Sequence, residues 1–256
     1  MKDKGLSWYP APRYIMRKEL LVKILNNCSS EGKSILEFGY GAGDMLVTCS
    51  KMGMDVYGYD HSDKARTFSE YWLRANDIDE YVLYTSKEEI SNIKYDFVMS
   101  CEVLEHIEAD IDQLTEWKKV INDNGKLIIS VPAHINKWSF NDVWAGHFRR
   151  YEKVELQNKL QKAGYKIEYI WSYPVPFHWV LDKLLDKSAR KMLITRKEMN
   201  MELSTKDSGV IRDVNAFYRF FSKKAFLWPM ILLQELFLNT DIGSGYVVVA
   251  SVEENS

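Results

Sequence analysis

Short apolar segments alternate with helical segments through the first two thirds of the chain, and this alternation constrains the fold most strongly. The expected strands are Ser34–Phe38, Asp55–Tyr59, Tyr81–Thr85, Tyr95–Ser100, Leu127–Val131, Lys166–Ser172 and Tyr246–Ser251. The expected helices are Asp44–Met52, Lys64–Asn76, Ala109–Ile121 and Tyr151–Ala163. Asn124-Gly125 is expected to turn the chain into the following strand, and Gly164 to cap the last helix. Apolar strands joined by helical crossovers predict an α/β fold built on a parallel sheet.

The composition narrows the class of protein. The 256 residues are 46% hydrophobic and 27% charged, with a formal net charge of −2. A chain this close to neutral lacks the basic field of a dedicated nucleic-acid binder, so no nucleic-acid partner is expected. Its 3 cysteines form neither a disulfide framework nor a CxxC metal knuckle, which favours a reducing compartment and predicts no metal centre. The first ten residues lack the apolar core of a secretory signal, so a cytoplasmic protein is expected.

A long segment separates the last two expected strands and divides the chain into two parts. Residues 1–172 and 245–256 are expected to form the sheet domain, and residues 173–244 a helical insert. Helical patterns occur at Phe177–Leu185, Val214–Phe221 and Ala225–Leu238. The insert is expected to serve as a substrate lid, a dimer interface or a membrane contact. Its basic run Lys187–Lys197 is either a solvated helix face or a contact for an anionic membrane or acceptor.

A glycine-rich loop follows the first expected strand and marks a ligand site. The sequence Ile35-Leu-Glu-Phe-Gly-Tyr-Gly-Ala-Gly-Asp44 places three glycines between a strand and a helix. Glycines there allow a tight turn and a close approach of a ligand to the backbone, although turns and helix caps also use glycine. Asp60 ends the next strand, where a carboxylate can accept hydrogen bonds from both hydroxyls of a ribose. The GxGxG spacing differs from the GxGxxG of nicotinamide enzymes, which disfavours a dehydrogenase.

The segments LEFGYGAG, VYGYDHS and YDFVMSCEVLEHI resemble the class I S-adenosylmethionine-dependent methyltransferases. CEVLEHI resembles the branch that contains the ubiquinone-biosynthesis O-methyltransferases. The resemblance covers Ser34 to Val131 closely and the final strand more loosely. It implies a Rossmann-like sheet of seven strands in the order 3-2-1-4-5-7-6 with an antiparallel last strand, and S-adenosyl-L-methionine as the cofactor, leaving S-adenosyl-L-homocysteine as the product.

The resemblance also implies a set of cofactor contacts. Residues Glu37, Gly39, Gly41 and Gly43 would cradle the methionine part, Asp60 with His61 would hold the ribose, and Cys101 with Glu102 would flank the sulfonium end. The family often has an acidic residue after the third strand, near the adenine amino group. Here that position is Ser86, which can serve only as a neutral partner.

The segment from Trp138 to Tyr151 is expected to form the acceptor side of the active site. It follows the fifth strand and therefore lies at the carboxyl edge of the sheet, where open α/β proteins bind ligands. Its GHFRRY string resembles bacterial methyltransferases associated with polysaccharides and lipid-linked sugars. Three residues are expected to act in catalysis: His147, Asp142 and His106. Four are expected to bind the acceptor: Trp144, Arg149, Arg150 and Tyr151. The structural alternatives are that His147 caps the helix expected at Tyr151, that an arginine bridges to an acidic helix face, and that His106 caps or packs against its own helix.

These features together predict a methyltransferase that methylates a hydroxyl group of a sugar, a glycolipid or another small acceptor. An N-methyltransferase acting on an amine or a protein side chain is one alternative, and a non-catalytic cofactor-binding module is another. Cys101-Glu102-Val103 stands where enzymes that methylate base amino groups carry an Asn/Asp-Pro-Pro-Tyr loop, which disfavours nucleic-acid bases as acceptors. The insert is the expected site of homodimerisation or of peripheral contact with the inner face of a membrane.

Overall fold

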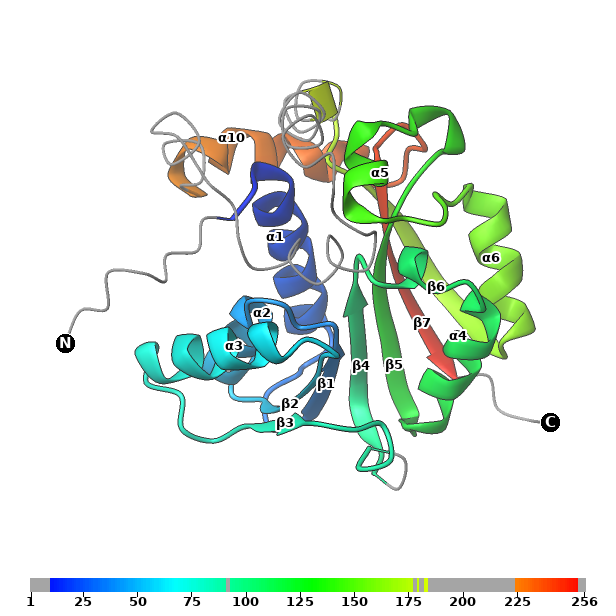
Figure 1. Cartoon of the computed structure of the whole chain (residues 1–256). Coiled ribbons are helices and arrows are strands. Elements are labelled where there is room, and N and C mark those ends of the chain that lie inside the picture. The colour runs from blue at the N-terminus through cyan, green and yellow to red at the C-terminus, as the bar shows by residue number, and fades with distance from the viewer. Residues whose placement is uncertain (1–9, 91–92, 177–178, 180–181, 184–223, 253–256) are drawn as a thin grey trace, which may run out of the picture.

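A seven-stranded sheet forms the centre of the molecule, with the strand order β3-β2-β1-β4-β5-β7-β6 (Figure 1). The computed structural model describes residues 10–90, 93–176, 179, 182–183 and 224–252. Strand β7 runs antiparallel to both of its neighbours, and the other neighbouring pairs are parallel. The strands are β1 Ser34–Phe38, β2 Asp55–Tyr59, β3 Val82–Tyr84, β4 Tyr95–Cys101, β5 Ile121–Pro132, β6 Tyr165–Tyr173 and β7 Gly245–Val252. The predicted fold class and strand order are confirmed.

Helices cover both faces of this sheet. The α-helices are α1 Pro12–Asn27, α2 Asp44–Lys51, α3 Asp63–Ala75, α4 Asp110–Lys119, α5 Phe140–Ala145, α6 Lys153–Lys162 and α10 Lys224–Gln234. Short 3₁₀ turns are η1 Leu104–His106, η2 Ile135–Lys137 and η3 Glu235–Phe237. Because successive strand residues point to opposite faces, Leu36 packs in the core beside α4 and α6, whereas Ile35 packs in the core beside α1, α2 and α3.

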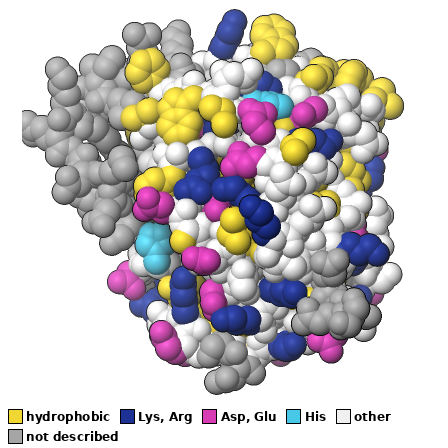
Figure 2. Space-filling model, turned by 90° about the vertical axis from the view of Figure 1, so that its right-hand side faces the viewer, with side chains coloured by type: hydrophobic (Ala, Val, Ile, Leu, Met, Phe, Trp, Pro, Cys, Tyr) yellow, Lys and Arg dark blue, Asp and Glu magenta, His cyan; other side chains and the backbone are white. Residues whose placement is uncertain are grey.

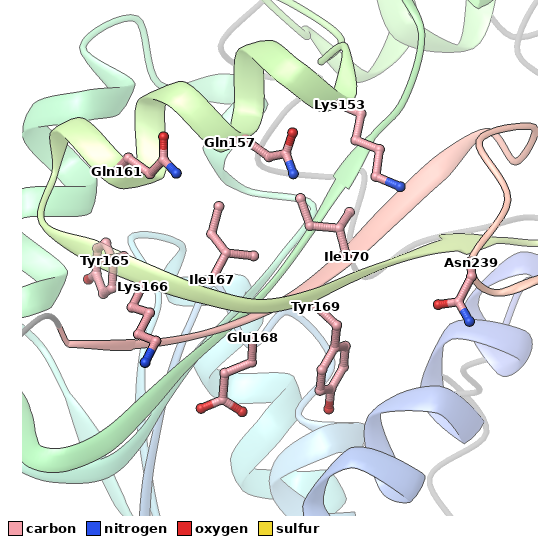
Figure 3. A pocket seen from close by; sticks show the side chains of 10 residues that line it. All are labelled: Lys153, Gln157, Gln161, Tyr165, Lys166, Ile167, Glu168, Tyr169, Ile170 and Asn239. Atoms are coloured by element: carbon pink, nitrogen blue, oxygen red, sulfur yellow. The ribbon is translucent and has the colours of Figure 1, made fainter.

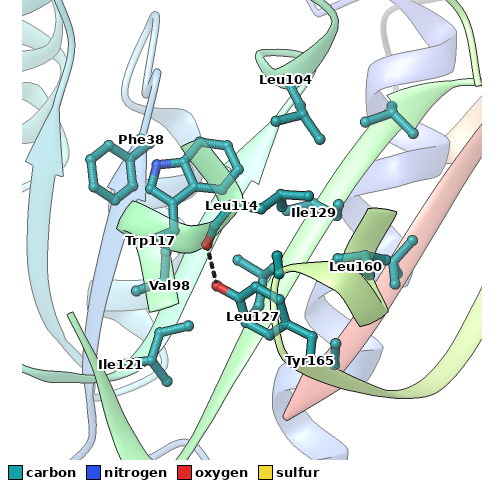
Figure 4. Close-up of a cluster of buried hydrophobic side chains, with 14 of the residues drawn as sticks. Phe38, Val98, Leu104, Leu114, Trp117, Ile121, Leu127, Ile129, Leu160 and Tyr165 are labelled. Atoms are coloured by element: carbon teal, nitrogen blue, oxygen red, sulfur yellow. Dashed lines mark hydrogen bonds between the residues drawn. The ribbon is translucent and has the colours of Figure 1, made fainter. Parts of the chain in front are cut away.

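The core between the sheet and helices α4 and α6 is rich in aromatic side chains (Figure 4). Trp117 of α4 lies against Phe38 of β1, with ring centroids 5.4 Å apart. The buried Tyr165 hydroxyl donates a hydrogen bond to the Leu114 carbonyl oxygen at 2.9 Å. Each fully buried large apolar side chain contributes about 1.5–3 kcal/mol, so this layer fixes the base on which the loops at the carboxyl edge are built.

Helix α1 was not expected from the sequence analysis, although its pattern is readable. Pro12 stands at the start of the helix, where a missing N–H costs nothing. Leu20, Leu21, Ile24 and Leu25 recur at helical spacing, and all are buried. The helix packs across the sheet and carries Arg13 and Arg17 to its carboxyl edge, which makes it part of the site described below.

Three other expectations about the positions of elements were wrong. The helix expected at Ala109–Ile121 ends at Lys119, and Ile121 already begins β5, which has an irregular register opposite Tyr95 and Phe97. Asn124-Gly125 therefore lies within this irregular strand and does not precede it. The helix expected at Tyr151 begins at Lys153, because the Tyr151 backbone instead forms a bridge with Ala133.

The described part of the expected insert belongs to the same packed body. Leu227 and Ile231 of α10 pack against Ile15 and Met16 of α1. The Gln234 side-chain amide donates a hydrogen bond to the Met16 carbonyl oxygen at 3.4 Å. The basic run Lys187–Lys197 and the Val214–Phe221 pattern lie outside the described residues, so the division into two domains stays a prediction. Among the described residues, no helix has the length and apolar character needed to cross a membrane.

Candidate active site

The glycine loop after β1 is tied to the end of β2 through Asp60. One Asp60 carboxylate oxygen accepts a hydrogen bond from the Gly41 backbone N–H at 3.0 Å, and the other accepts one from the Ser62 N–H at 2.9 Å. Gly41 has φ of 51° and Gly43 has φ of 74°, a left-handed conformation that glycine adopts without strain. A carboxylate offers about four lone-pair positions, so Asp60 keeps acceptor capacity for a ribose beside the loop.

Polar atoms without partners point to a ligand at the same edge. Glu37 is 3% exposed, and its Oε2 accepts no hydrogen bond from the described residues. Burial raises the pKa of Glu37 to about 8, an effect that the Arg17 charge only partly offsets. The Nε atoms of Arg13 and Arg17 likewise donate to no described residue. A zwitterionic amino acid supplies both complements, an ammonium group for Glu37 and a carboxylate for an arginine, so these residues fit the methionine part of the expected cofactor.

Glu102 joins α1 to the ends of β4 and β6. Its carboxylate lies 3.3 Å from Arg17 Nη1 and 3.5 Å from Arg13 Nη2. It also accepts a 2.8 Å hydrogen bond from the Tyr173 hydroxyl, which stands at the end of β6. Burial opposes the charge, but Arg13 and Arg17 outweigh it and hold the pKa of Glu102 at about 2. Glu102 has φ of 58°, so the chain turns sharply after β4 to aim this carboxylate at α1.

On the other side of β4, Asp142 holds two residues of the Trp138–Tyr151 segment in place. Arg150 donates from Nε and Nη2 to the two Asp142 oxygens at 2.8 and 2.9 Å. The His147 Nδ1 lies 2.8 Å from Asp142 Oδ1. Burial opposes the charge, but the hydrogen bonds from His147 and Arg150 outweigh it and hold the pKa of Asp142 well below its usual range. An ionised Asp142 accepts the Nδ1–H proton, which leaves the lone pair of a neutral His147 on Nε2.

Two residues of η1 face this histidine. Glu105 is fully buried, and its Oε1 lies 3.7 Å from His147 Nε2. The His106 ring stands edge-on to the His147 ring, with centroids 4.8 Å apart, and its Nδ1 lies 3.2 Å from the Gly146 carbonyl oxygen. Burial lowers the pKa of His106 to about 4, so this imidazole is neutral at pH 7. The structural alternative that His147 caps a helix at Tyr151 is wrong, because His147 instead faces Asp142 and Glu105.

Three of the four residues expected to bind the acceptor form polar contacts within the protein. Arg150 is 4% exposed and occupied by Asp142, and Tyr151 is fully buried with its hydroxyl donating to Asp110 at 3.0 Å. Arg149 Nη1 donates to the same carboxylate at 2.7 Å. Trp144 is 6% exposed, and its Nε1–H donates to no described residue. Direct binding of the acceptor by these four residues stays a prediction, because sequence position alone does not show which polar residues pair with each other.

The remaining expected cofactor residues lie near the sheet edge. Cys101 ends β4, and burial raises the pKa of its thiol to about 12, which keeps it protonated. Gly39 lies against Val103, whose Cγ2 would be 2.4 Å from a Cβ at that position, so this glycine serves loop packing. His61 is largely exposed, with its Nδ1 3.7 Å from Asp60. Ser86 follows β3, and its backbone N–H donates to Glu89 at 2.9 Å.

Sequence reasoning missed four residues of the site: Arg13, Arg17, Glu105 and Tyr173. The two arginines were readable as an i, i+4 pair on the apolar side of a helix with Pro12 at its start, where charged residues need a partner. Glu105 lies within the quoted CEVLEHI motif, but only the structure shows that its carboxyl is buried. Tyr173 reaches Glu102 across the sheet, and nothing in the sequence indicates that contact.

A separate groove of about 600 Å³ lies along β6 and α6 (Figure 3). Its walls include Gln157 and Gln161 of α6 and Glu168 and Tyr169 of β6. It lies beside the edge strand of the sheet, away from the glycine loop after β1. This groove is therefore separate from the polar groups that gather at the carboxyl ends of β1 and β4.

Comparison with known proteins agrees with this architecture. A family model described as a methyltransferase domain matches residues 13–170. The chain is 23% identical over 191 residues to a ubiquinone biosynthesis O-methyltransferase of Rhizobium leguminosarum bv. trifolii. The aligned region covers 67% of this chain and 75% of that protein. It is 30% identical over 102 residues to the same kind of enzyme from Photobacterium profundum, covering 39% of this chain and 43% of that one.

Solved structures share the fold at low sequence identity. An S-adenosylmethionine-dependent methyltransferase of Clostridium acetobutylicum aligns with a TM-score of 0.54 at 9% identity, covering 94% of this chain and 92% of that one. The magnesium protoporphyrin IX methyltransferase of Synechocystis, solved with bound S-adenosylhomocysteine, aligns at 0.55 with 16% identity over 65% of this chain and 80% of that one. The cyclase SpnF aligns at 0.63 with 13% identity, covering 99% of this chain and 85% of that one.

The family match extends over more than half of the chain and includes α1, the glycine loop, Asp60 and Glu105. The strand order and the unpartnered buried polar atoms at the carboxyl edge agree with this family match. This chain belongs to the methyltransferase domain family and is an S-adenosylmethionine-dependent methyltransferase.

Proposed function

We propose that this enzyme transfers a methyl group to a hydroxyl of a small acceptor such as a sugar or a glycolipid. The observation that carries the proposal is the arrangement of His147, whose Nδ1 is held by the ionised Asp142 at 2.8 Å. A histidine oriented in this way suits removal of a proton from a hydroxyl. The relatives named as O-methyltransferases support the same class of reaction.

The residues around the glycine loop would hold the cofactor. We assign the ribose to Asp60, the methionine ammonium to Glu37 and the methionine carboxylate to Arg17. The cofactor supplies an electrophilic methyl group with a good sulfur leaving group. The chain therefore has mainly to align the acceptor oxygen with that methyl, and such positioning contributes on the order of 7–11 kcal/mol in favourable cases.

We place the acceptor between the end of β4 and the loop that follows β5. Strands β1 and β4 are neighbours, with Phe38 opposite Ser100, so the glycine loop and the residues after Cys101 share one edge. Strand β5 lies next to β4, and the chain after it leads through α5 to His147. In this arrangement Asp142 orients His147, and Arg150 positions Asp142, while Glu102 and Arg17 bound the side toward α1.

Exposed apolar side chains favour membrane contact as a second property of this enzyme. Trp228 and Leu236, in α10 and η3, are 56% and 78% exposed, and Phe148 and Val143 near α5 are about half exposed. Figure 2 shows hydrophobic side chains gathered along the upper edge of the molecule, while charges of both signs are interspersed below them. We propose that this edge rests on a lipid surface when the acceptor is a glycolipid, and that a homodimer is the alternative that covers it.

The experiment that tests methyl transfer is a screen of hydroxylated acceptors with S-adenosylmethionine. The panel includes catechols, monosaccharides and lipid-linked sugars, with the amine analogue of each acceptor as its matched partner. Formation of S-adenosylhomocysteine together with a methyl ether, identified by NMR, is the expected result. Products methylated only on nitrogen would overturn the proposal in favour of the N-methyltransferase alternative.

A further inference from the structure

Three side chains with metal-ligating atoms meet beside the proposed acceptor site. One ligand atom each from Glu105, His106 and His147 lies within 4.8 Å of the other two. The closest printed pair is Glu105 Oε1 and His147 Nε2, at 3.7 Å. Ligand atoms around one zinc ion are separated by roughly 3.3 Å, given metal–ligand bonds of about 2.0–2.2 Å. The widest separation in the cluster thus exceeds this spacing by at most about 1.5 Å, and the Glu105–His147 pair exceeds it by about 0.4 Å.

The Glu105 carboxyl gives an independent reason to expect a ligand. Its side chain is fully buried, and neither of its carboxyl oxygens accepts a hydrogen bond from any residue that the structure describes. An acid in such surroundings is costly unless it is paired or bound to a cation. Arg13 and Arg17 of α1 form ion pairs with Glu102 instead.

The two histidines are already held in the way that metal-ligating histidines usually are. His147 donates its Nδ1–H to the Asp142 carboxylate, and His106 donates its Nδ1–H to the Gly146 carbonyl oxygen. Such outer contacts fix the ring orientation and leave the other nitrogen as the lone-pair donor. Arg150 in turn fixes Asp142 by a two-pronged contact, so the support extends one residue further from the cluster.

We propose that Glu105, His106 and His147 bind a zinc-type divalent metal ion, and that its open coordination position takes the acceptor hydroxyl oxygen. This inference rests on the proposed function and states how the acceptor hydroxyl is activated. Three protein ligands with one open position are typical of catalytic zinc, which lowers the pKa of a bound oxygen ligand. Two histidines and one carboxylate provide the mixed nitrogen and oxygen ligands that suit such an ion.

The transfer step balances without an oxidant or a reductant. The O–H bond of the acceptor breaks, and the proton passes to solvent. The acceptor oxygen then forms a bond to the methyl carbon while the carbon–sulfur bond breaks, and that electron pair stays on sulfur. The products are a methyl ether, S-adenosylhomocysteine and one proton. In this arrangement His147 contributes a ligand nitrogen, and the ion replaces it as the group that favours the deprotonated oxygen.

Metal binding itself provides the test, because it needs no knowledge of the acceptor. The full chain is treated with a chelator, dialysed and titrated with Co²⁺, which reports its ligands through visible absorption, and with Zn²⁺ by calorimetry. We expect one ion per chain, and a rise in melting temperature on metal addition. Glu105→Gln should weaken binding at least tenfold, since loss of outer contacts alone typically costs 10–100-fold. It should also remove the melting shift.

The control variant is His134→Gln, which alters another largely buried histidine beside the carboxylates Glu152 and Asp241. Its metal affinity should equal that of the wild type. The metal proposal is overturned if the wild type takes up no stoichiometric Co²⁺ or Zn²⁺, or if Glu105→Gln binds them as the wild type does. It is also overturned if methyl transfer proceeds at the full rate in the chelator-treated enzyme, and in that outcome the proposed function survives. Failure of S-adenosylhomocysteine to bind would instead count against the proposed function.

Discussion

At the scale of single residues, the site contains four buried acidic side chains, of which only two are paired with cations and hydrogen-bond donors. Glu102 and Asp142 are surrounded by cations and hydrogen-bond donors, which favour their ionised forms. Glu37 and Glu105 are buried as deeply but lack such partners, and their pKa values are raised. The compensated pair shapes the site, and the uncompensated pair marks the positions where the ligands should supply the missing charge.

The first prediction concerns Glu37 and pH. Its pKa is raised to about 8 in the folded protein, so the folded state binds a proton more tightly than the unfolded state does between about pH 4.5 and pH 8. The cofactor-free protein therefore loses stability as pH rises through this window. Glu37→Gln should be more stable than the wild type at pH 8, by on the order of 2–4 kcal/mol, and should bind S-adenosylmethionine less tightly.

Urea unfolding at pH 5 and pH 8, combined with calorimetric titration of the cofactor, measures both effects. Asp63→Asn is the matched control, because that carboxylate is almost fully exposed on α3. The advantage of Glu37→Gln over the wild type should be larger at pH 8 than at pH 5. An equal stability difference at the two pH values would show that the pKa of Glu37 is not raised in the folded protein.

The second prediction concerns His147. His147→Asn should lower turnover by roughly 10²–10⁴-fold while leaving the affinity for S-adenosylhomocysteine unchanged, because the imidazole lies on the acceptor side of β4. Steady-state kinetics with the acceptor found in the screen measures the first effect, and calorimetry the second. His134→Asn should retain near-normal turnover. Normal turnover in His147→Asn would remove this residue from the chemistry and direct attention to His106.

At the scale of elements, the loop after β5 is stabilised by one buried ion pair. The third prediction is that Arg150→Ala destabilises the protein by about 3–5 kcal/mol, since it leaves Asp142 charged and buried without its main partner. It should also lower turnover, because Asp142 orients His147. Chemical denaturation together with kinetics checks both effects. An intact fold with only a raised KM for the acceptor would restore the expectation from the sequence that Arg150 binds the acceptor directly.

The helices and strands divide into features that local sequence patterns predict and features that tertiary packing determines. The glycine loop, Asp60 and the core strands were predictable because each depends on local pattern: glycine spacing, apolar runs and the order of strand and helix. The start of β5 was not predictable, since Asn124-Gly125 has the composition of a turn but lies in an irregular strand held by its neighbour β4. The roles of Arg150 and Tyr151 were missed for a similar reason, because their partners Asp142 and Asp110 are set by tertiary packing.

The fourth prediction concerns α10 and the turn that follows it. If its exposed apolar side chains rest on lipid, the double variant Trp228→Ser and Leu236→Ser should bind vesicles of an anionic phospholipid several-fold more weakly than the wild type. Sedimentation with vesicles measures this, and sedimentation velocity without vesicles measures the oligomeric state. Equal vesicle binding by the two proteins would exclude this edge as the membrane contact. A shift from dimer to monomer in the variant would assign the edge to an interface between copies.

At the scale of the whole molecule, the sheet order determines which groups can meet. The adjacency of β1, β4 and β5 brings the glycine loop, the CEVLEHI motif and the GHFRRY segment to one edge, although more than one hundred residues separate the first from the last. The predicted strand order is therefore the basis on which we propose how the cofactor and acceptor sides lie relative to each other. It could not show that α1 closes the edge with Arg13 and Arg17, since no strand pattern specifies where a flanking helix docks.

A crystal structure of the full chain with bound S-adenosylhomocysteine tests the proposed cofactor and acceptor sites most directly. We predict ribose hydroxyls within hydrogen-bond distance of Asp60, the ammonium group at Glu37 and the carboxylate at Arg17. The sulfur should be directed toward the side that holds Glu105, His106 and His147. A ligand bound elsewhere, or a sulfur directed away from these three residues, would contradict the placement of the acceptor site.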